Sequence, residues 1–213
     1  MNVGKRMSKV LITVPPDLPV PDALALMTKE KIRHIPVIEK GKLKGIITKN
    51  DLLNASPSKA TSLSVWEINY LVSKIKVADV MTTKVYTTTE DTPIEEAARV
   101  MSDKKISCLP VLRGKDLVGI ITETDLFKIF LELLGARQKG VRLTAVIPDK
   151  PGELARITQA IYKAGGNLIA LGSFAGETAA TSLITVKVEG VTEKTLKKVV
   201  EPLVKKLTDI RTL

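Results

Sequence analysis

The hydrophobic and polar positions of the chain follow one pattern twice. Apolar residues at helical spacing over Val20–Met27 precede two β-branched runs, Ile35–Ile38 and Leu43–Ile47, which predict a helix followed by a hairpin. The same pattern returns 74 residues further along the chain, at Ile94–Met101, Leu109–Leu112 and Leu117–Ile121. We therefore predict two tandem copies of one supersecondary unit.

Each copy has one further element at either end. The short β-branched segments Leu11–Val14 and Val85–Thr88 end at turns and predict a first strand. Thr48 and Thr122 follow the hairpins and open short helices. The unit that we expect is therefore β–α–β–β–α.

A glycine lies inside the second hairpin strand of each predicted copy. Gly45 and Gly119 occupy equivalent positions in Gly-Ile-Ile-Thr. Glycine weakens a strand and commonly marks a place where another group approaches the backbone closely. We expect such an approach at both glycines.

The segment between the copies predicts a linker helix over residues 59–76. Ser64 and Glu67 have the spacing of a capping box, and apolar residues recur behind them at helical spacing. One interpretation is that this helix covers the core of the repeats. The other is that its wide apolar face, with Trp66 and Tyr70, also meets a second subunit.

The last third of the chain follows a different pattern. It predicts the order βαββαβ of a ferredoxin-like sandwich. The expected strands are Val141–Ile147, Leu168–Phe174, Thr181–Val188 and Asp209–Leu213, with helices from Leu154 to Ile161 and from Thr192 to Leu207. The fold class is thus a mixture of α/β repeats and an α+β domain.

The charge is uneven along the 213 residues. The formal net charge is +10, of which residues 1–76 carry +7, residues 77–139 carry −1 and residues 140–213 carry +4. A basic excess indicates nucleic acid, an anionic membrane or a phosphorylated ligand as partner, and a solvated lysine-rich surface is the alternative. Aromatic residues make up 3% of the chain, which argues against base-stacking platforms.

Several classes of protein are excluded by composition. Cys108 and His34 are the only cysteine and histidine, so a disulfide framework, a cysteine-built zinc site and most histidine-built metal sites are ruled out. No run of 18 apolar residues and no signal-peptide core occurs, so we expect a cytoplasmic protein without a membrane span. Phosphate-loop, dinucleotide and catalytic-triad motifs are missing too, so we expect no enzyme and no metal site.

Thr-x-x-Asp occurs in both copies, at Thr48–Asp51 and Thr122–Asp125. One interpretation is structural, since a threonine at a helix start and an acidic residue three positions later form a capping box. The other is functional, since a helix start suits phosphate and a nearby carboxylate can accept hydrogen bonds from a ribose. The spacing leaves both open.

With these motifs each copy resembles a cystathionine-β-synthase (CBS) domain, and the tandem resembles a Bateman module. The resemblance implies two clefts that bind adenine nucleotides or related adenosyl ligands. It implies that Asp51 and Asp125 take ribose hydroxyls and that Thr48 and Thr122 lie near phosphate. The implied nucleotide-binding residues are Ile12, Thr13, Arg33, His34, Pro36, Thr48, Asp51, Tyr86, Thr87, Ser107, Cys108, Pro110, Thr122 and Asp125.

The copies differ before the first hairpin strand. Copy one has Arg33-His34 where copy two has Ser107-Cys108. Because arginine is a bidentate partner of phosphate, we predict that the copy-one cleft holds the more highly phosphorylated ligand. We expect Cys108 to be a small buried filler.

The C-terminal third resembles an ACT domain, a small regulatory fold that often binds amino acids between paired subunits. The resemblance rests on Asp149-Lys-Pro-Gly152-Glu153-Leu154 and on Asn167 after two glycines. It implies that Asp149, Gly152, Glu153, Leu154 and Asn167 surround a small ligand. The alternative is a helix cap and a helix stop without a ligand.

The expected domains are CBS repeat 1 (1–58), a linker helix (59–76), CBS repeat 2 (77–134) and an ACT domain (141–213). This architecture resembles the acetoin-utilisation CBS–ACT proteins. It implies a regulatory, homodimeric sensor with an adenine nucleotide as regulatory ligand and an unknown enzyme as partner. The alternatives are a basic nucleic-acid-binding regulator and a structural pairing subunit with empty clefts.

Overall fold

The computed structural model describes residues 1–55 and 64–213 and divides into two compact units, Met1–Leu126 and Phe127–Leu213. Their boundary falls inside one helix, α6 (Glu123–Leu133). Among the described residues, no helix is both long enough and apolar enough to cross a membrane. Each unit is described below by itself.

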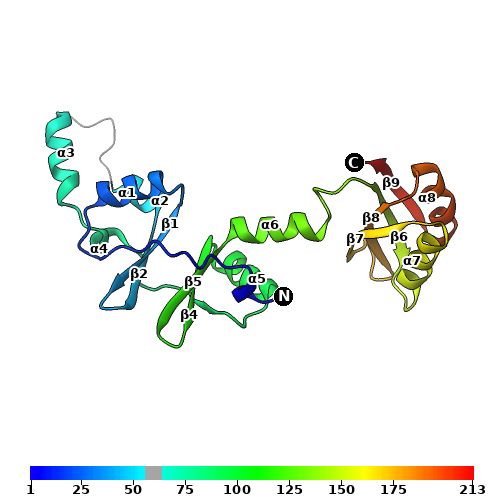
Figure 1. Cartoon of the computed structure of the whole chain (residues 1–213), viewed down its shortest axis with the longest axis horizontal. Helices are drawn as coiled ribbons and strands as arrows, with labels where there is room; N and C mark the ends of the chain where they lie inside the picture. Colours follow the sequence, from blue (N-terminus) through cyan, green and yellow to red (C-terminus); the bar gives the residue numbers. More distant parts are fainter. Residues whose placement is uncertain (56–63) are drawn as a thin grey trace. The chain divides into compact units, whose positions relative to one another are not determined.

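The first unit contains both repeats (Figure 1). Copy one contributes the hairpin β1–β2, and copy two contributes the three-stranded sheet β3–β4–β5. The elements are η1 (Val3–Lys5), α1 (Val20–Lys29), β1 (His34–Glu39), β2 (Lys42–Thr48), α2 (Lys49–Asn54), α3 (Val65–Lys74), α4 (Val77–Val80), β3 (Thr88–Thr89), α5 (Ile94–Lys104), β4 (Cys108–Arg113) and β5 (Asp116–Thr122), before α6.

The two hairpins repeat each other down to their irregularities. The β1–β2 register shifts between Val37 and Ile38, and the β4–β5 register shifts 74 residues later, between Val111 and Leu112. The helix before each hairpin is followed by a lysine with positive φ, 55° at Lys31 and 53° at its equivalent in copy two. The predicted repeat is therefore confirmed at the level of the backbone.

The first strand predicted for copy one is wrong. Over Leu11–Val14 the structure has a single parallel bridge, from Val14 to Val37. Pro15 and Pro16 follow at once, and proline has no amide hydrogen to continue a ladder. The equivalent strand in copy two is present but shorter than predicted, because only Thr88–Thr89 pairs with β4.

The beginning of each copy packs on the other copy. The Val3 amide donates to the Thr92 carbonyl at 2.9 Å, and the Val77 amide donates to the Leu18 carbonyl at 2.9 Å. Val3 is buried in the core of copy two, whereas Val77 is buried in the core of copy one. Figure 1 accordingly shows the N-terminus beside α5. Because the start of each copy packs into the core of the other, the two copies form one unit.

Both strand glycines lie under a segment of the other copy. A Cβ placed on Gly45 would lie 2.6 Å from the sulfur of Met81 and 2.9 Å from the Thr82 carbonyl oxygen. A Cβ on Gly119 would collide with the sulfur of Met7. The expected close approach is therefore confirmed, and the exchanged starts of the copies cause it.

The predicted linker helix is described as α3, while residues 59–63 lie outside the described residues. The expected capping box is present, since the Ser64 amide donates to Glu67 Oε2 at 2.8 Å and the Glu67 amide donates back to Ser64 Oγ at 3.3 Å. Val72 on this helix is buried against copy one. Trp66 and Tyr70 are 85% and 63% exposed, so part of the apolar face is uncovered.

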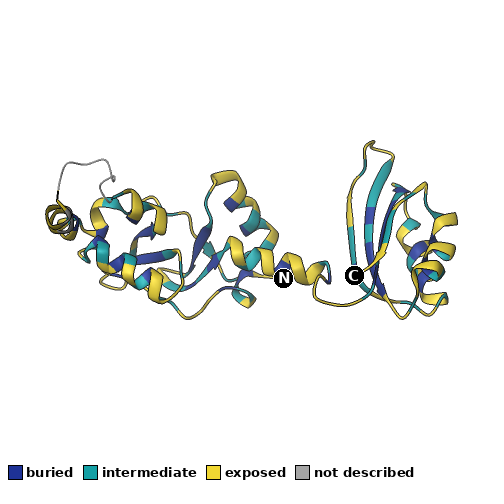
Figure 2. Cartoon of the chain, turned by 90° about the horizontal axis from the view of Figure 1, so that it is seen from above, coloured by how far each residue is buried: buried dark blue, intermediate teal, exposed yellow. Residues whose placement is uncertain are grey.

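The second unit has the predicted βαββαβ order. Its four strands form one antiparallel sheet in the order β7-β8-β6-β9, and its core lies between one face of the sheet and the two helices (Figure 2). The elements after α6 are β6 (Val141–Pro148), α7 (Glu153–Lys163), β7 (Asn167–Ala175), β8 (Thr181–Glu189), α8 (Glu193–Val200), η2 (Glu201–Leu203) and β9 (Lys206–Thr212).

The last predicted helix is shorter than expected. We predicted one helix over Thr192–Leu207, but α8 ends at Val200 and β9 already begins at Lys206. Pro202 lies within the predicted span, and its ring excludes a continued helix. The alternation of lysines and apolar residues continues past Pro202, because the following strand β9 also alternates polar and apolar residues.

Candidate ligand-binding cavity

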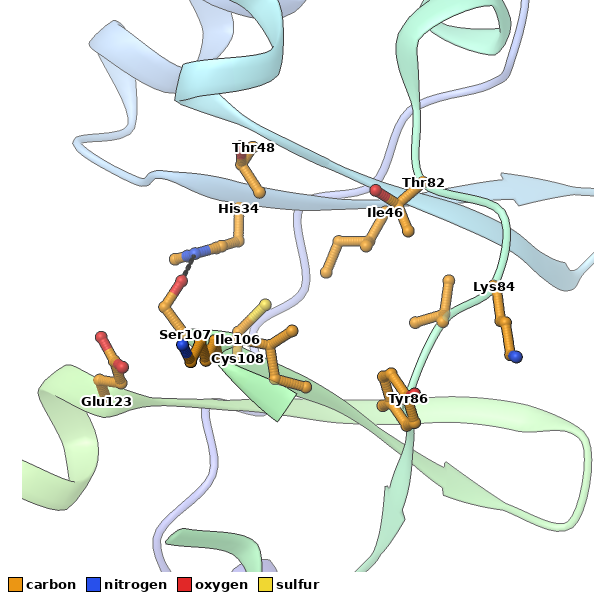
Figure 3. Close-up of a pocket in the computed structure, with 12 residues that line it drawn as sticks. His34, Ile46, Thr48, Thr82, Lys84, Tyr86, Ile106, Ser107, Cys108 and Glu123 are labelled. Carbon is orange, nitrogen blue, oxygen red and sulfur yellow. Dashed lines mark hydrogen bonds between the residues drawn. The ribbon is translucent and has the colours of Figure 1, made fainter. Parts of the chain in front are cut away.

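A cavity of about 240 Å³ lies between the two copies and is partly open to solvent. Its lining comes from both hairpins and from the segment that enters copy two (Figure 3). The lining residues are His34, Ile46, Thr48, Thr82, Lys84, Val85, Tyr86, Lys105, Ile106, Ser107, Cys108 and Glu123. Apolar walls with a few polar groups are typical of small-molecule sites.

His34 links the two copies across this cavity. Its Nε2 lies 2.6 Å from Ser107 Oγ, as the dashed line in Figure 3 marks. Burial lowers the pKa of His34 from its ordinary value of 6.5, the charge of Arg33 lowers it further, and Asp51 opposes both. The imidazole is therefore neutral at pH 7 and can donate or accept a hydrogen bond there.

Cys108 forms part of the cavity wall next to Ser107. It is 7% exposed, and burial raises the pKa of its thiol to about 12, with a further contribution from the charge of Glu123. A thiol with such a pKa is protonated and unreactive at neutral pH. The prediction that Cys108 is a buried filler is confirmed, and it also lines the cavity.

Both Thr-x-x-Asp motifs form helix caps. The Thr48 amide donates to Asp51 Oδ2 at 2.8 Å, and the Asp51 amide donates to Thr48 Oγ1 at 3.3 Å. In copy two, the amide and the hydroxyl of Thr122 both donate to Asp125 Oδ2, at 3.0 and 2.8 Å. The structural interpretation is confirmed. It leaves the functional one open, because a carboxylate has about four acceptor positions.

Arg33 extends across to the start of α6. Its Nη2 donates to Thr124 Oγ1 at 3.3 Å, and the side chain is exposed. It is not among the residues that line the cavity of His34. Arg33 and Thr124 therefore meet beside the start of α6.

The remaining predicted residues of the repeats do not line the cavity. Pro36 and Pro110 are buried within β1 and β4. Ile12 and Thr13 lie in the irregular segment before α1, and Thr87 lines a second hollow of about 350 Å³ near the hairpin turns. Of the fourteen residues implied by the resemblance, His34, Thr48, Tyr86, Ser107 and Cys108 line the cavity.

Seven lining residues were missed by the motif argument. Lys84, Val85, Lys105 and Ile106 flank predicted positions in the sequence, so a wider window around the motifs would have included them. Glu123 lies within the Thr-x-x-Asp motif itself. Ile46 and Thr82 come together because the start of copy two crosses copy one, and no local pattern reveals that crossing.

The residues predicted for the C-terminal unit lie at the start of α7 and on the edge strand β7. Asp149 is in the exposed turn after β6, and its amide donates to the Ala180 carbonyl at 3.0 Å. Gly152 precedes α7 with a φ of 89°, which explains the glycine. Leu154, in the first turn of α7, is 37% exposed.

The side chains of Glu153 and Asn167 have partners within the unit. Glu153 pairs with Arg156 at 3.2 Å, one turn further along α7. Asn167 Nδ2 donates to Glu189 Oε1 at 2.6 Å, between the paired ends of β7 and β8. An ion pair within α7 and a strand-end contact account for these two side chains.

Among the described residues, no group of three or more His, Cys, Asp or Glu side chains is arranged so that it could hold a metal ion.

The two repeats match the CBS domain family at residues 3–58 and 77–132, more than half of the chain. The chain belongs to the CBS domain family. The match agrees with the two copies defined by the sequence pattern and ends at residue 132, within α6 and before the first strand of the C-terminal sheet.

Three solved structures are similar to the CBS region. A Vibrio cholerae protein named for acetoin utilization (AcuB) is 32% identical, with 65% of this chain and 96% of that chain covered and a TM-score of 0.53. The CBS pair of protein MJ0100 in complex with 5′-methylthioadenosine and S-adenosylmethionine is 30% identical, with 65% and 98% covered and a TM-score of 0.52. CBSX2 in complex with AMP is 31% identical, with 61% and 96% covered and a TM-score of 0.51.

Curated relatives include larger proteins that contain a similar region. The L-aspartate semialdehyde sulfurtransferase of Methanocaldococcus jannaschii is 32% identical over 126 residues, which are 58% of this chain and 22% of that protein. The chain therefore matches about a fifth of this relative.

Proposed function

We propose that this chain is a non-catalytic regulatory protein whose CBS pair senses an adenine nucleotide (AMP, ADP or ATP) or another adenosyl compound. The observation that carries the proposal is the cavity between the copies, because five of the residues implied by the family resemblance line it. Similar CBS pairs have been solved with AMP and with S-adenosylmethionine, which supports the ligand class.

The geometry suits a sensor because the lining belongs to both copies. A ligand that contacts His34 and Thr48 of copy one together with Tyr86 and Ser107 of copy two stabilises one arrangement of the hairpins over others. The shift in that equilibrium equals the difference in affinity between the arrangements. A partner enzyme or a second subunit would then read the altered surface.

The direct test is calorimetry of the whole chain with AMP, ADP, ATP and S-adenosylmethionine. We expect at least one of them to bind with micromolar affinity, and we expect Asp125→Ala to weaken it at least tenfold through lost ribose contacts. Asp22→Ala, an exposed acidic residue at the start of α1, is the matched control. Absence of binding by all four ligands would leave the structural pairing subunit as the better description.

A second cleft is proposed on the side of copy one that carries Arg33. The Arg33 guanidinium contacts Thr124 at the start of α6, and Lys49 opens the equivalent helix of copy one. We expect this cleft to hold the more highly phosphorylated ligand. Titration of Arg33→Ala with AMP and ATP tests this, and unchanged affinities for both would contradict it.

The C-terminal unit is proposed to be an ACT-type regulatory domain. Its βαββαβ order and the glycine at the start of α7 support this assignment. On this proposal the protein is a cytoplasmic homodimer, an amino acid binds near Asp149 and Asn167, and acetoin utilisation is the pathway. Thermal-shift screening against the twenty amino acids checks the ligand, because a bound ligand raises the melting temperature.

A further inference from the structure

A charged side chain is buried in the C-terminal sheet. Among the described residues the buried polar side chains are those of Thr144 and Lys187, and Lys187 is only 4% exposed. It lies on β8 opposite Arg142 of β6. Arg142 alternates with the core residue Leu143 along β6, so Lys187 points to the face of the sheet away from α7 and α8. A lysine is rarely buried without a specific contact.

The contact of Lys187 is with the segment that ends α6. Its Nζ donates to the Gly135 carbonyl at 3.0 Å. Asp209, on the same face of the sheet, pairs with Arg142 and Arg211. The partner that the structure gives the buried ammonium group is therefore a backbone carbonyl at the end of a helix.

Gly135 ends α6 in a Schellman motif. The Ala136 amide donates to the Leu131 carbonyl at 2.9 Å. The Gly135 amide donates to the Glu132 carbonyl at 3.0 Å, and the φ of Gly135 is 57°. The Gln138 amide donates to the Gly135 carbonyl at 3.1 Å, so this oxygen is shared with the buried ammonium group. A cation at a helix C-terminus is also favoured by the helix dipole.

The same turn packs closely on β7. A Cβ placed on Gly135 would lie 2.6 Å from Ile169 Cγ2 and 3.6 Å from Ala170 Cβ. A Cβ placed on Gly172 would lie 3.6 Å from Leu134 Cδ2. An apolar contact and a charged hydrogen bond therefore hold the end of α6 on the sheet.

The start of α6 is held by residues of both CBS copies. The Glu123 amide donates to the Ser107 carbonyl of copy two at 3.0 Å, and Arg33 of copy one contacts Thr124. Between these contacts and the turn, α6 is one helix of 11 residues. A continuous helix of this length is a rigid element, so its two ends move together.

We propose that Lys187 is a positioning residue that fastens the end of α6 to the C-terminal sheet, so that a movement of the helix start is passed on to that sheet. The fastening follows from the contacts around Gly135, whereas the passage of a ligand signal rests on the proposed function. A ligand that favours one arrangement of the hairpins would displace α6. Without the ammonium group, the helix could move while the sheet stays in place.

The test measures amide hydrogen exchange of the whole chain in wild type and in Lys187→Met. Methionine keeps a long unbranched stem and removes the charge. We expect the amides of Ala136 and Gln138 to exchange about tenfold faster in the variant. The amides of β6 and β8 and the midpoint of urea unfolding should not fall below those of the control, because an apolar group suits a buried position.

Lys206→Met is the matched control, because Lys206 is an exposed lysine opposite Val146 on the same face of the sheet. Gly135→Ala should speed exchange at the same two amides with Lys187 still present, because its methyl group would collide with Ile169. Faster exchange in Gly135→Ala but not in Lys187→Met would show that packing alone holds the turn, which overturns the proposal. A Lys187→Met chain that does not fold, or whose whole sheet exchanges faster, overturns it as well, because Lys187 would then support the sheet itself.

The signal is tested with AMP or S-adenosylmethionine, whichever binds wild type in calorimetry. We expect the bound ligand to change exchange at Ala136 and Gln138 about threefold in wild type but not in Lys187→Met, while the Thr124 and Asp125 amides respond in both. Binding that leaves Ala136 and Gln138 unchanged in wild type, or changes them equally in the variant, overturns the role of Lys187. Absence of binding overturns the proposed function and the signal, while the fastening of α6 still stands or falls on the exchange in ligand-free Lys187→Met.

Discussion

The two CBS copies have nearly the same backbone but different side chains around the cavity. The register shift in the hairpin and the positive φ before it recur at equivalent positions. In contrast, Arg33-His34 corresponds to Ser107-Cys108, and Lys49 corresponds to Glu123. Core positions are constrained by close packing, whereas residues that face a cavity tolerate changes of charge without loss of the core.

The copies also differ at the first strand, for a local reason. Val14 makes one bridge and is followed by Pro15-Pro16, whereas Thr88–Thr89 makes a two-residue strand and is followed by Glu90. A difference of this kind changes the edge of the sheet without moving the cavity, which both hairpins line.

Substitution of the strand glycines is expected to give the largest difference in stability between the copies. At Gly45, a new side chain would meet the Thr82 backbone oxygen as well as Met81, whereas at Gly119 it meets the Met7 side chain. We expect Gly45→Val to reduce the free energy of unfolding by about 3 kcal/mol and Gly119→Val by about 1–2 kcal/mol, measured by urea denaturation.

Second-site variants decide whether the backbone contact causes this difference. Met7→Ala should relieve most of the added cost of Gly119→Val, because it removes the colliding side chain. Met81→Ala should relieve Gly45→Val only in part, because the Thr82 carbonyl remains. Equal relief in both copies would contradict the explanation.

The threonines at the two helix starts should contribute similarly and moderately to stability, although the Thr48 hydroxyl accepts from the Asp51 amide and the Thr122 hydroxyl donates to Asp125. Thr48→Ala and Thr122→Ala each remove a hydroxyl at a helix start, and we expect each to reduce the free energy of unfolding by about 1 kcal/mol. Thr28→Ala is the control, since its hydroxyl only donates to the Leu24 carbonyl within α1. A loss confined to one copy in urea denaturation would show that the two caps are not equivalent.

The smallest expected effect is a dependence of stability on pH that comes from His34 in copy one. Because the folded-state pKa of His34 lies below 6.5, its contribution to stability is fully present above pH 6.5, where the imidazole is neutral in both states. That contribution is lost as the pH falls below 6.5 toward the lower folded-state pKa, since the unfolded chain binds the proton first. Thermal melts between pH 7.5 and pH 5 measure the loss.

His34→Cys gives copy one the residue that copy two has at this position, Cys108. We expect this variant to lose the acid-dependent part of the change in melting temperature. An unchanged pH profile would assign the dependence to another group. Ser107→Ala separates the hydrogen bond from burial, because it removes the partner of the imidazole and leaves the ring in place.

Much of the fold could be predicted from local patterns. The helices α1 and α5, both hairpins and the βαββαβ order follow from periodicity, and the Thr-x-x-Asp caps follow from spacing. The errors lie where proline changes the outcome, at Leu11–Val14 and at Thr192–Leu207. The predicted helix runs past Pro202, which cannot make the required backbone hydrogen bond, whereas the predicted strand ends directly before Pro15-Pro16, which cannot extend its ladder.

The cavity was less predictable than the repeats that form it. His34, Thr48 and Ser107 were named from motifs, but Asp51 and Asp125 are engaged in caps and Arg33 is directed to α6. Residues on one motif share a segment of chain, whereas a cavity needs side chains from several segments that face one point.

The sequence by itself determined the tandem repeat, the helix starts and the concentration of positive charge in the first 76 residues, because these depend on local spacing and composition. Only the tertiary structure decided that the start of each copy packs on the other, which covers Gly45 and Gly119 and brings Thr82 to Ile46. Likewise, only the tertiary structure decided that Glu123 faces the same cavity as His34. Contacts between residues far apart in sequence depend on how whole segments pack, and no short pattern records them.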